Sequence, residues 1–296
     1  MALLIPFGVG VALASIVGGA QAQLGIVVGA TCSAAGVLTE LPARVRVQFV
    51  AVVALCAGLG AWATGRAVLV ALAVAAAALA QAHWVRLSSN VGPMLPVAVA
   101  IGASVPQAGP ALGFAAWAGA GGMAMMIGAR LAKVATLASP VPTPLARRHA
   151  VLVAAVSALA SWLTTARGIE HGYWLVVTLA AVLRPIGAET LSRARTRSLA
   201  TVAGVLVAIA LVSVVPTPIA LGSAAAAVIL AVAWALTGDQ VRQTLYLTPA
   251  IIMAASAGTA SFAVALAGQR LALTLVGAAV ALLLAWALAR WSDREH

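Results

Sequence analysis

Acidic residues are scarce in this 296-residue sequence, which holds six Asp and Glu against 17 Lys and Arg. Only 8% of the residues are charged, whereas 64% are hydrophobic and the mean hydropathy is +1.10. Soluble domains carry about 25% charged and about 45–50% apolar residues, so the composition excludes a water-soluble fold. The few carboxylates also cannot supply both a catalytic centre and a solvated surface. We therefore expect an all-α polytopic membrane protein.

Cysteines and catalytic motifs are equally scarce. Cys32 and Cys56 lie in apolar runs far from any polar cluster, which favours buried thiols over a disulfide or a metal pair. The sequence has no Gly-rich phosphate loop followed by Lys, no His-Glu-x-x-His and no paired-Asp motif of prenyl transfer. We expect neither an enzyme nor a metal or cofactor site. The net charge of +11 belongs to no basic arm or soluble module, so nucleic acid is not an expected partner.

Apolar runs separated by Gly, Pro and charged residues predict about twelve transmembrane helices, because about 20 apolar residues cross a bilayer. No Lys or Arg precedes the apolar stretch of residues 1–22, so we interpret it as the first of these helices rather than a signal peptide. The predicted spans are 3–20, 23–39, 46–64, 67–85, 91–105, 109–130, 148–166, 173–189, 197–215, 217–237, 243–260 and 270–289.

The basic residues favour one orientation of these spans. With both termini cytoplasmic, 14 Lys and Arg fall on the inner side and three, Arg66, Arg167 and Arg270, on the outer side. This distribution follows the positive-inside rule and predicts a multi-pass protein of the inner or plasma membrane. Alternating prolines at residues 140–147 predict a stiff cytoplasmic linker. The linker would join an N-terminal six-helix repeat at 1–139 to a C-terminal one at 148–296.

Two internal repeats point to a transporter-like architecture. The pattern Glu-x3-Arg-x-Arg occurs at residues 40–46 and again at 189–195, both on the cytoplasmic side, which favours two parallel six-helix repeats. The pattern Arg-x3-Thr-x2-Gly occurs at 197–204 and, 73 residues later, at 270–277. In the predicted topology each copy begins a helix and the two helices run in opposite directions, as in the inverted repeats of transporters. The alternative is that these small residues only allow close helix packing.

Arg184 is a cation within an apolar run. It follows ten uncharged residues and precedes Pro185, which weakens the helix and can free backbone groups to line a cavity. A cation at such a position usually faces the protein interior or water, which predicts a site for an anionic substrate. The alternative is that its side chain extends to the cytoplasmic headgroups, about five residues away.

The segment His171-Gly-Tyr-Trp174-x3-Thr178-x6-Pro185-x-Gly187, followed by the pattern at 197–204, resembles the fusaric acid resistance-like membrane domain. That family includes aromatic carboxylic acid exporters and is distantly similar to plant aluminium-activated malate transporters. The resemblance implies a pore built from paired six-span units. The sequence departs from the family in three ways. Arg184 replaces a neutral polar residue, and the N-terminal half lacks the motif. The large cytoplasmic domains of many members are missing.

These features predict a transporter or channel-like exporter of small organic anions, with aromatic carboxylates as the class that the resemblance implies. The sequence has no nucleotide site, so the membrane potential or a proton gradient would drive transport. The alternative function is a non-transporting scaffold or assembly protein of the cell envelope. An intramembrane enzyme acting on lipid-linked substrates would need acidic clusters that the sequence lacks.

Expected partners are a small organic anion and membrane lipid, and a homo-oligomer is left open. The candidate substrate-binding residues are Trp174, Thr178, Arg184, Arg197, Thr201, Arg270 and Thr274.

Overall fold

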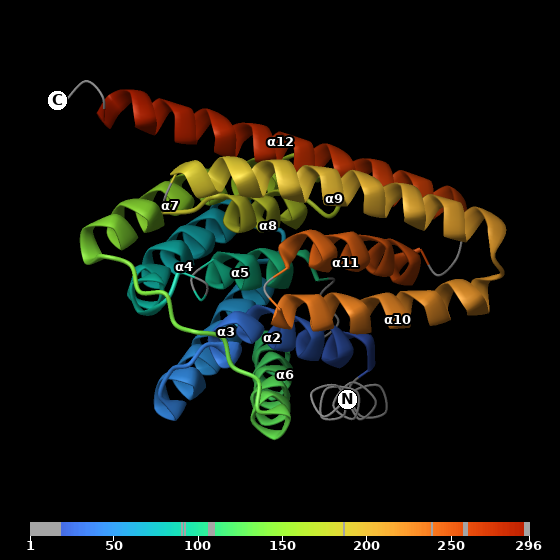
Figure 1. The fold of residues 1–296 in the computed structure, drawn as a ribbon, viewed down its shortest axis with the longest axis horizontal. Helices are drawn as coiled ribbons and strands as arrows, with labels where there is room; N and C mark the ends of the chain where they lie inside the picture. The colour runs from blue at the N-terminus through green and yellow to red at the C-terminus, as the bar shows by residue number, and fades with distance from the viewer. Residues whose placement is uncertain are drawn as a thin grey trace. The chain divides into compact units, whose positions relative to one another are not determined.

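The computed structural model describes most of the chain, and the described residues fold almost entirely into α-helices (Figure 1). They are residues 19–89, 91, 93–105, 110–185, 187–237, 239–256 and 260–292. The helices are α2 (Gly19–Leu38), α3 (Ala43–Ala63), α4 (Ala67–Leu87), α5 (Met94–Ser104), α6 (Ala111–Ala132), α7 (Thr143–Ala166), α8 (Tyr173–Val182), α9 (Gly187–Val214), α10 (Thr217–Leu236), α11 (Gln240–Ala255) and α12 (Ala260–Ser292). These ranges contain no strand, so the all-α prediction is confirmed. The predicted span at 3–20 lies mostly outside them.

Seven of the described helices are long and apolar enough to cross a membrane. They are α2, α3, α4, α6, α7, α9 and α12. Since each carries a hydrophobic stretch of at least 18 residues, the chain is a multi-pass membrane protein. The total of twelve spans, the inner membrane and the cytoplasmic termini stay predictions.

The chain divides into two compact units between residues 185 and 186. The first unit contains α2 to α8, and the second contains α9 to α12. This division does not coincide with the predicted linker at 140–147, because α7 packs against α4 within the first unit. Locally, the residues without helix are 133–142, and α7 already begins at Thr143. Pro144 lies in its first turn, where the missing N–H of a proline is tolerated.

Two apolar helices of the first unit, α5 and α8, are too short to cross a membrane. They have 11 and 10 residues, and ten residues rise only about 15 Å, half of the hydrocarbon core. The sequence predicts one span over 173–189, which is wrong, because α8 ends at Val182. Pro185 disfavours helical geometry in the residue before it and has no N–H to donate. The two short helices pack against each other.

Glycines bring helix backbones of the first unit into direct contact. A Cβ atom on Gly29 of α2 would overlap the carbonyl of Ala118 on α6, and one on Gly121 of α6 would overlap the carbonyl of Ile26 on α2. Helices α3 and α5 meet in the same way at Gly60 and Gly102. Small residues allow this approach, and helix packing inside a membrane depends on it because lipid supplies little hydrophobic driving force.

The segments that motivate the parallel repeat differ in structure. Glu40 lies in the turn between α2 and α3, where its N–H donates to the carbonyl of Thr136 at 2.9 Å. Residues 189–195 instead belong to the first turns of α9, with Glu189 near the positive end of the helix dipole. The shift of 149 residues therefore pairs a turn with a helix, and the two six-helix repeats stay a prediction.

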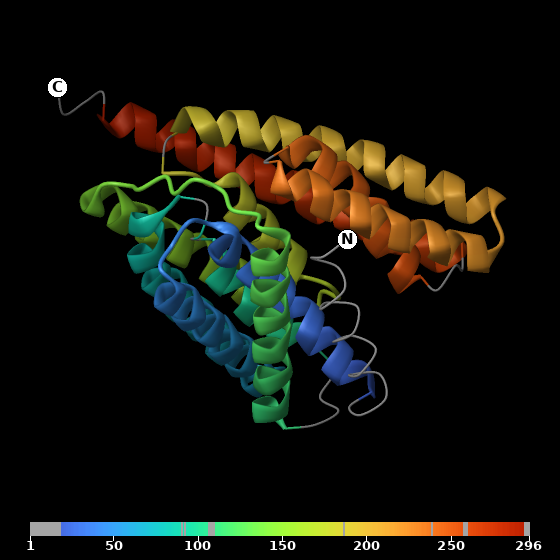
Figure 2. The same cartoon turned by 60° about the horizontal axis from the view of Figure 1, so that its bottom comes forward.

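In the second unit, α9 and α12 lie side by side and run in opposite directions (Figure 2). Helix α11 packs against both α9 and α10. An apolar cluster that includes Val205, Ala208, Ile252, Met253 and Ala267 joins these helices. Opposite directions for the two helices that carry the Arg-x3-Thr-x2-Gly pattern agree with an inverted arrangement of the two copies.

Both long helices begin earlier than the apolar runs predict. Helix α9 begins at Gly187 rather than Arg197, and α12 begins at Ala260 rather than Arg270. Arg is a good helix former and nothing before it ends the helix, so the chain is already helical when it reaches either residue. The prediction that these arginines begin their helices is therefore wrong. Each lies ten residues after a helix start, and the starts are themselves 73 residues apart.

Candidate functional site

The structure places the predicted site residues in two groups. Trp174, Thr178 and Arg184 belong to the first unit, on α8 and just after it. Arg197, Thr201, Arg270 and Thr274 belong to α9 and α12 of the second unit. Each group has its own polar surroundings.

The α8 group is buried inside the first unit. Trp174 is 8% exposed and its ring lies 4.8 Å from that of Tyr173, while Thr178 is fully buried. Arg184 is half-buried, and its Nη1 donates a hydrogen bond of 3.0 Å to the carbonyl of Ser89, in the turn between α4 and α5. The guanidinium thus ties the end of α8 to that turn.

We expect Arg184→Ala to lower the melting temperature in detergent by a few degrees, because a hydrogen bond to a charged group contributes about 1.5–3 kcal/mol. Transport should stay within about tenfold of wild type, since the side chain already has a structural partner. Arg86→Ala, which removes an exposed cation at the same end of α4, is the matched control and should change neither measurement. Lost transport at an unchanged melting temperature would contradict this and make Arg184 a substrate ligand.

A pocket of about 220 Å³ opens where α7 turns into α8. The loop packs closely on α7 here, because a Cβ on Gly172 would overlap the side chain of Thr164. His171 has φ = 54°, in the left-handed region that few residues other than glycine adopt. The lining residues are Val70 of α4, Ala100, Ala103 and Ser104 of α5, Ser161, Thr164 and Thr165 of α7, and the loop residues Gly168, Ile169, Glu170, His171, Gly172 and Tyr173. None of the predicted site residues lines this pocket.

In the second unit, Arg270 is a buried cation within an apolar span. It is 3% exposed and lies inside the hydrophobic stretch Ser261–Ala287, not at an outer helix start as the sequence predicts. Its Nη2 donates to Oγ1 of Thr248 on α11 at 3.3 Å. A cation at such depth is costly and usually marks a substrate or ion pathway.

Thr248 connects the two copies of the Arg-x3-Thr-x2-Gly pattern. It accepts the hydrogen bond of Arg270 from the second copy, and it packs on Gly204 of the first. A Cβ on Gly204 would lie 2.7 Å from Cβ of Thr248 and 3.1 Å from Cδ of Pro249. This close approach of α9 to α11 therefore depends on glycine at position 204.

The remaining predicted residues of the second unit are also turned inward. Thr201 is 2% exposed and Thr274 is 3% exposed, whereas Arg197 is half-buried. In each copy of the pattern, Arg, Thr and Gly at i, i+4 and i+7 share one face of the helix. The buried threonines confirm that this face points into the unit rather than toward lipid.

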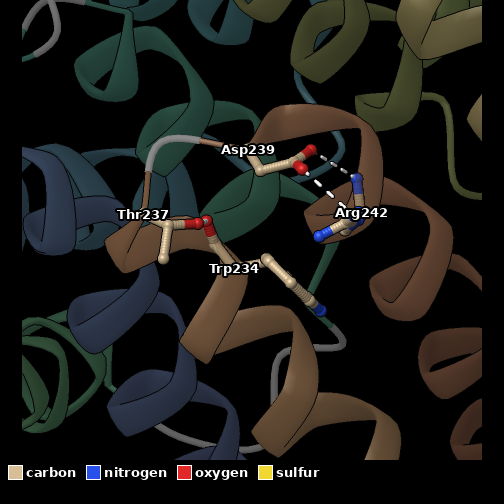
Figure 3. Close-up of polar contacts among 4 residues, drawn as sticks. All are labelled: Trp234, Thr237, Asp239 and Arg242. Carbon is tan, nitrogen blue, oxygen red and sulfur yellow. Dashed lines mark hydrogen bonds and ion pairs between the residues drawn. The ribbon is translucent and has the colours of Figure 1, made fainter.

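The turn between α10 and α11 holds a cation that is already paired (Figure 3). Oδ1 of Asp239 accepts a hydrogen bond of 3.0 Å from the backbone N–H of Arg242, and this bond caps the start of α11. Oδ2 of Asp239 lies 3.5 Å from Nε of Arg242. The guanidinium carbon lies 4.2 Å from the ring centroid of Trp234. Because both charged side chains are substantially exposed, we assign this cluster to the turn and not to substrate binding.

The sequence analysis did not identify Thr248 or the pocket residues, although pairs of polar residues in α11 and α7 indicate both. Thr244 and Thr248 are one turn apart, and Thr248 directly precedes Pro249 and the apolar end of the helix. Ser157 and Ser161 repeat that spacing in α7. Polar residues four positions apart share a helix face, so each pair predicts a polar stripe on its helix.

A family model described as fusaric acid resistance protein-like matches residues 156–284. This segment is therefore similar to the fusaric acid resistance-like family. It extends from α7 to α12 and includes the α8 break, both copies of the Arg-x3-Thr-x2-Gly pattern and Thr248. No curated protein and no solved structure matches the chain. The further similarity to aluminium-activated malate transporters stays a prediction.

Proposed function

We propose that this protein transports small organic anions across a membrane, with aromatic carboxylates as the preferred class. The fusaric acid resistance-like segment supports a transporter-like function, and the seven long apolar helices support a membrane location. The carboxylate class rests on the resemblance and on the position of Arg270. The proposed substrate contacts in the second unit are Arg197, Thr201, Arg270 and Thr274. Trp174 and Thr178 of the first unit remain separate candidates, whereas Arg184 is assigned to its contact with the carbonyl of Ser89.

The observation that carries the proposal is the burial of Arg270. Placing an arginine inside a membrane helix costs about 2.5–3.5 kcal/mol on insertion scales, so such a residue usually has a function. A carboxylate from a substrate would match the charge and accept two parallel hydrogen bonds from the guanidinium. A cation that binds anions during transport is one such function.

The membrane potential is the proposed driving force. An inside-negative potential favours export of an anion by about 2.3 kcal/mol per charge per 100 mV, which corresponds to a concentration ratio of about 50. Proton coupling would require a titratable carrier. Among the acidic residues, Glu189 and Asp239 stand near the beginnings of α9 and α11 in the second unit.

Reconstituted vesicles test the proposal directly. The purified chain is reconstituted with labelled benzoate inside, and a potassium diffusion potential of either sign is imposed. We expect benzoate efflux to accelerate when the lumen is negative and to slow when it is positive, because the transported species carries one negative charge. Benzylamine, of similar size and opposite charge, is the matched control and should not move.

Absence of flux for benzoate and for a panel of aliphatic carboxylates, in vesicles that hold folded protein, would overturn the proposal. The scaffold alternative would then remain. Equal flux of benzoate and benzylamine would contradict the charge selectivity that we assign to Arg270.

A further inference from the structure

The interior of the first unit holds polar atoms without hydrogen-bond partners among the described residues. Six of them belong to α4, α7 and α8, and α7 packs against both of the other two helices. These six atoms are Nε2 and Oε1 of Gln81, Nδ1 of His149, Oγ of Ser157, Oγ of Ser161 and Oγ1 of Thr178. Each of these side chains is at most 6% exposed.

These unpartnered polar side chains would be unfavourable in a dry, apolar interior. An unsatisfied buried polar group costs about 1–3 kcal/mol, so five such side chains would cost about 5–15 kcal/mol, comparable to the whole stability of a folded protein. Buried polar groups without protein partners are normally satisfied by water. Water, or the polar group of a bound solute, would satisfy these groups.

Together these residues outline a path along the neighbouring helices. On α7, His149, Ser157 and Ser161 belong to the same buried helix face, and they span 12 residues, or about 18 Å. Helix α4 runs antiparallel to α7, because the N–H of Val141 donates to the carbonyl of Arg86 at one end and Val70 shares the pocket with Thr165 at the other. Gln81 lies on the buried face of α4, between these ends.

The path opens into the pocket of about 220 Å³. Ser161, which is 3% exposed and has an unpartnered hydroxyl, lies in the pocket wall and in the path at once. The ends of both short helices, Ser104 of α5 and Tyr173 of α8, line the same pocket. Broken or short helices that end at mid-membrane are where transporters place their binding sites.

We propose that α4, α7 and α8 enclose a water-filled half-channel, which opens at the pocket, passes Ser161 and Ser157, and ends near Gln81 and His149. It admits water and small hydrogen-bonding solutes into the first unit. The hydroxyls and the imidazole offer donors and acceptors together, so a solute with a hydroxyl or carboxyl group fits the lining. The half-channel is built from residues of the first unit alone, and its hydration does not depend on which solute the protein transports.

Cysteine accessibility in the full-length protein tests the half-channel. Single cysteines replace Ser161, Ser157 or Thr178 in a Cys32→Ala, Cys56→Ala background, and a charged methanethiosulfonate reagent is the probe. Since a serine-to-cysteine exchange changes little in volume, these variants should fold. We expect Ser161→Cys to react most rapidly of the three and Ser157→Cys and Thr178→Cys more slowly, because they lie deeper.

Two positions calibrate the rates. Arg167→Cys, in the exposed loop after α7, marks full access, and Leu159→Cys, 56% exposed on the opposite face of α7, marks contact with lipid. Only the thiolate reacts, so Leu159→Cys should be at least about 100-fold slower than Arg167→Cys. Half-channel positions should fall within about tenfold of Arg167→Cys if water reaches them. Rates at 157, 161 and 178 as slow as at 159 would overturn the proposal.

Closing the pocket supplies a second measurement. Ala103→Phe places a ring in the pocket wall from α5 and should slow labelling at positions 157 and 161 without changing Arg167→Cys. Unchanged labelling at 157 and 161 would contradict the pocket as the entrance. Either failure leaves the benzoate flux assay unaffected, so the half-channel and anion transport stand or fall separately.

Discussion

Arg270→Gln should lower benzoate transport by at least about 100-fold. Removing one partner of a buried charge pair costs about 2–5 kcal/mol, and every 1.4 kcal/mol is tenfold. The substitution should not unfold the protein, because glutamine keeps a donor for Thr248, which holds the guanidinium at 3.3 Å. The melting temperature should stay constant or rise, since replacing a buried cation by a neutral side chain removes its desolvation cost.

The comparison variants separate charge from shape. Arg270→Lys keeps the charge and should retain part of the transport, whereas Arg270→Gln should not. Arg66→Gln is the matched control, because Arg66 is an exposed arginine that stacks on Trp62 at 4.9 Å, and its removal should change transport by less than about twofold. Wild-type transport in Arg270→Gln would show that the cation is structural and would remove the main support for an anion substrate.

Gly204→Leu should destabilise the protein and stop transport, while Gly222→Leu should do neither. A Cβ at position 204 would lie 2.7 Å from Cβ of Thr248 and 3.1 Å from the carbonyl oxygen of Leu245, so α9 and α11 must separate. A Cβ at position 222 meets nothing within 4 Å. Overpacking costs about 1–3 kcal/mol, and we expect the melting temperature of Gly204→Leu to fall by about 5–10 °C.

The transport measurement tests a second consequence of that packing. Because Thr248 lies between Gly204 and Arg270, displacing it should also move the guanidinium from its partner. Gly222→Leu should be neutral or slightly stabilising, since glycine inside a helix is about 0.5–1 kcal/mol less favourable than alanine. Equal melting temperatures for the two leucine variants would contradict the close approach of α9 and α11.

The pair of antiparallel helices accounts for the spacing of the repeated pattern. Both α9 and α12 carry Arg ten residues after the helix start, and the helices run side by side in opposite directions (Figure 2). Antiparallel packing brings the Arg of one copy toward the Gly of the other. Arg270 and Gly204 both touch Thr248, so the two copies meet inside one unit. The antiparallel packing of α9 and α12 thus supports the proposal of an inverted repeat, which the apolar runs alone did not.

Helix locations could be predicted from the sequence wherever a strong local signal ends the apolar run. Lys133 and the prolines at 140, 142 and 144 are such signals for the break between α6 and α7, although α7 begins at Thr143 and not at the predicted residue 148. Arg197 and Arg270 misled the prediction, because an arginine is a charge that a helix easily accommodates and not a helix breaker. The end of α8 was misjudged for the opposite reason, since Pro185 acts on the residues before it.

The sequence by itself determined the class of the protein, because a chain with 8% charged and 64% hydrophobic residues can satisfy its backbone and its surface only as helices in a bilayer. It also determined the resemblance to the fusaric acid resistance-like family through local residues of α8 and α9, and the family model matches residues 156–284. The tertiary structure alone decided which polar residues meet. Thr248 and Arg270 lie 22 residues apart and on different helices, and Ser161 reaches the pocket only because α4, α5 and α7 converge there. In a uniformly apolar chain, the local sequence does not distinguish one helix face from another. The contacts are instead decided by close packing between helices at glycines and other small residues, and no local pattern specifies which helices meet.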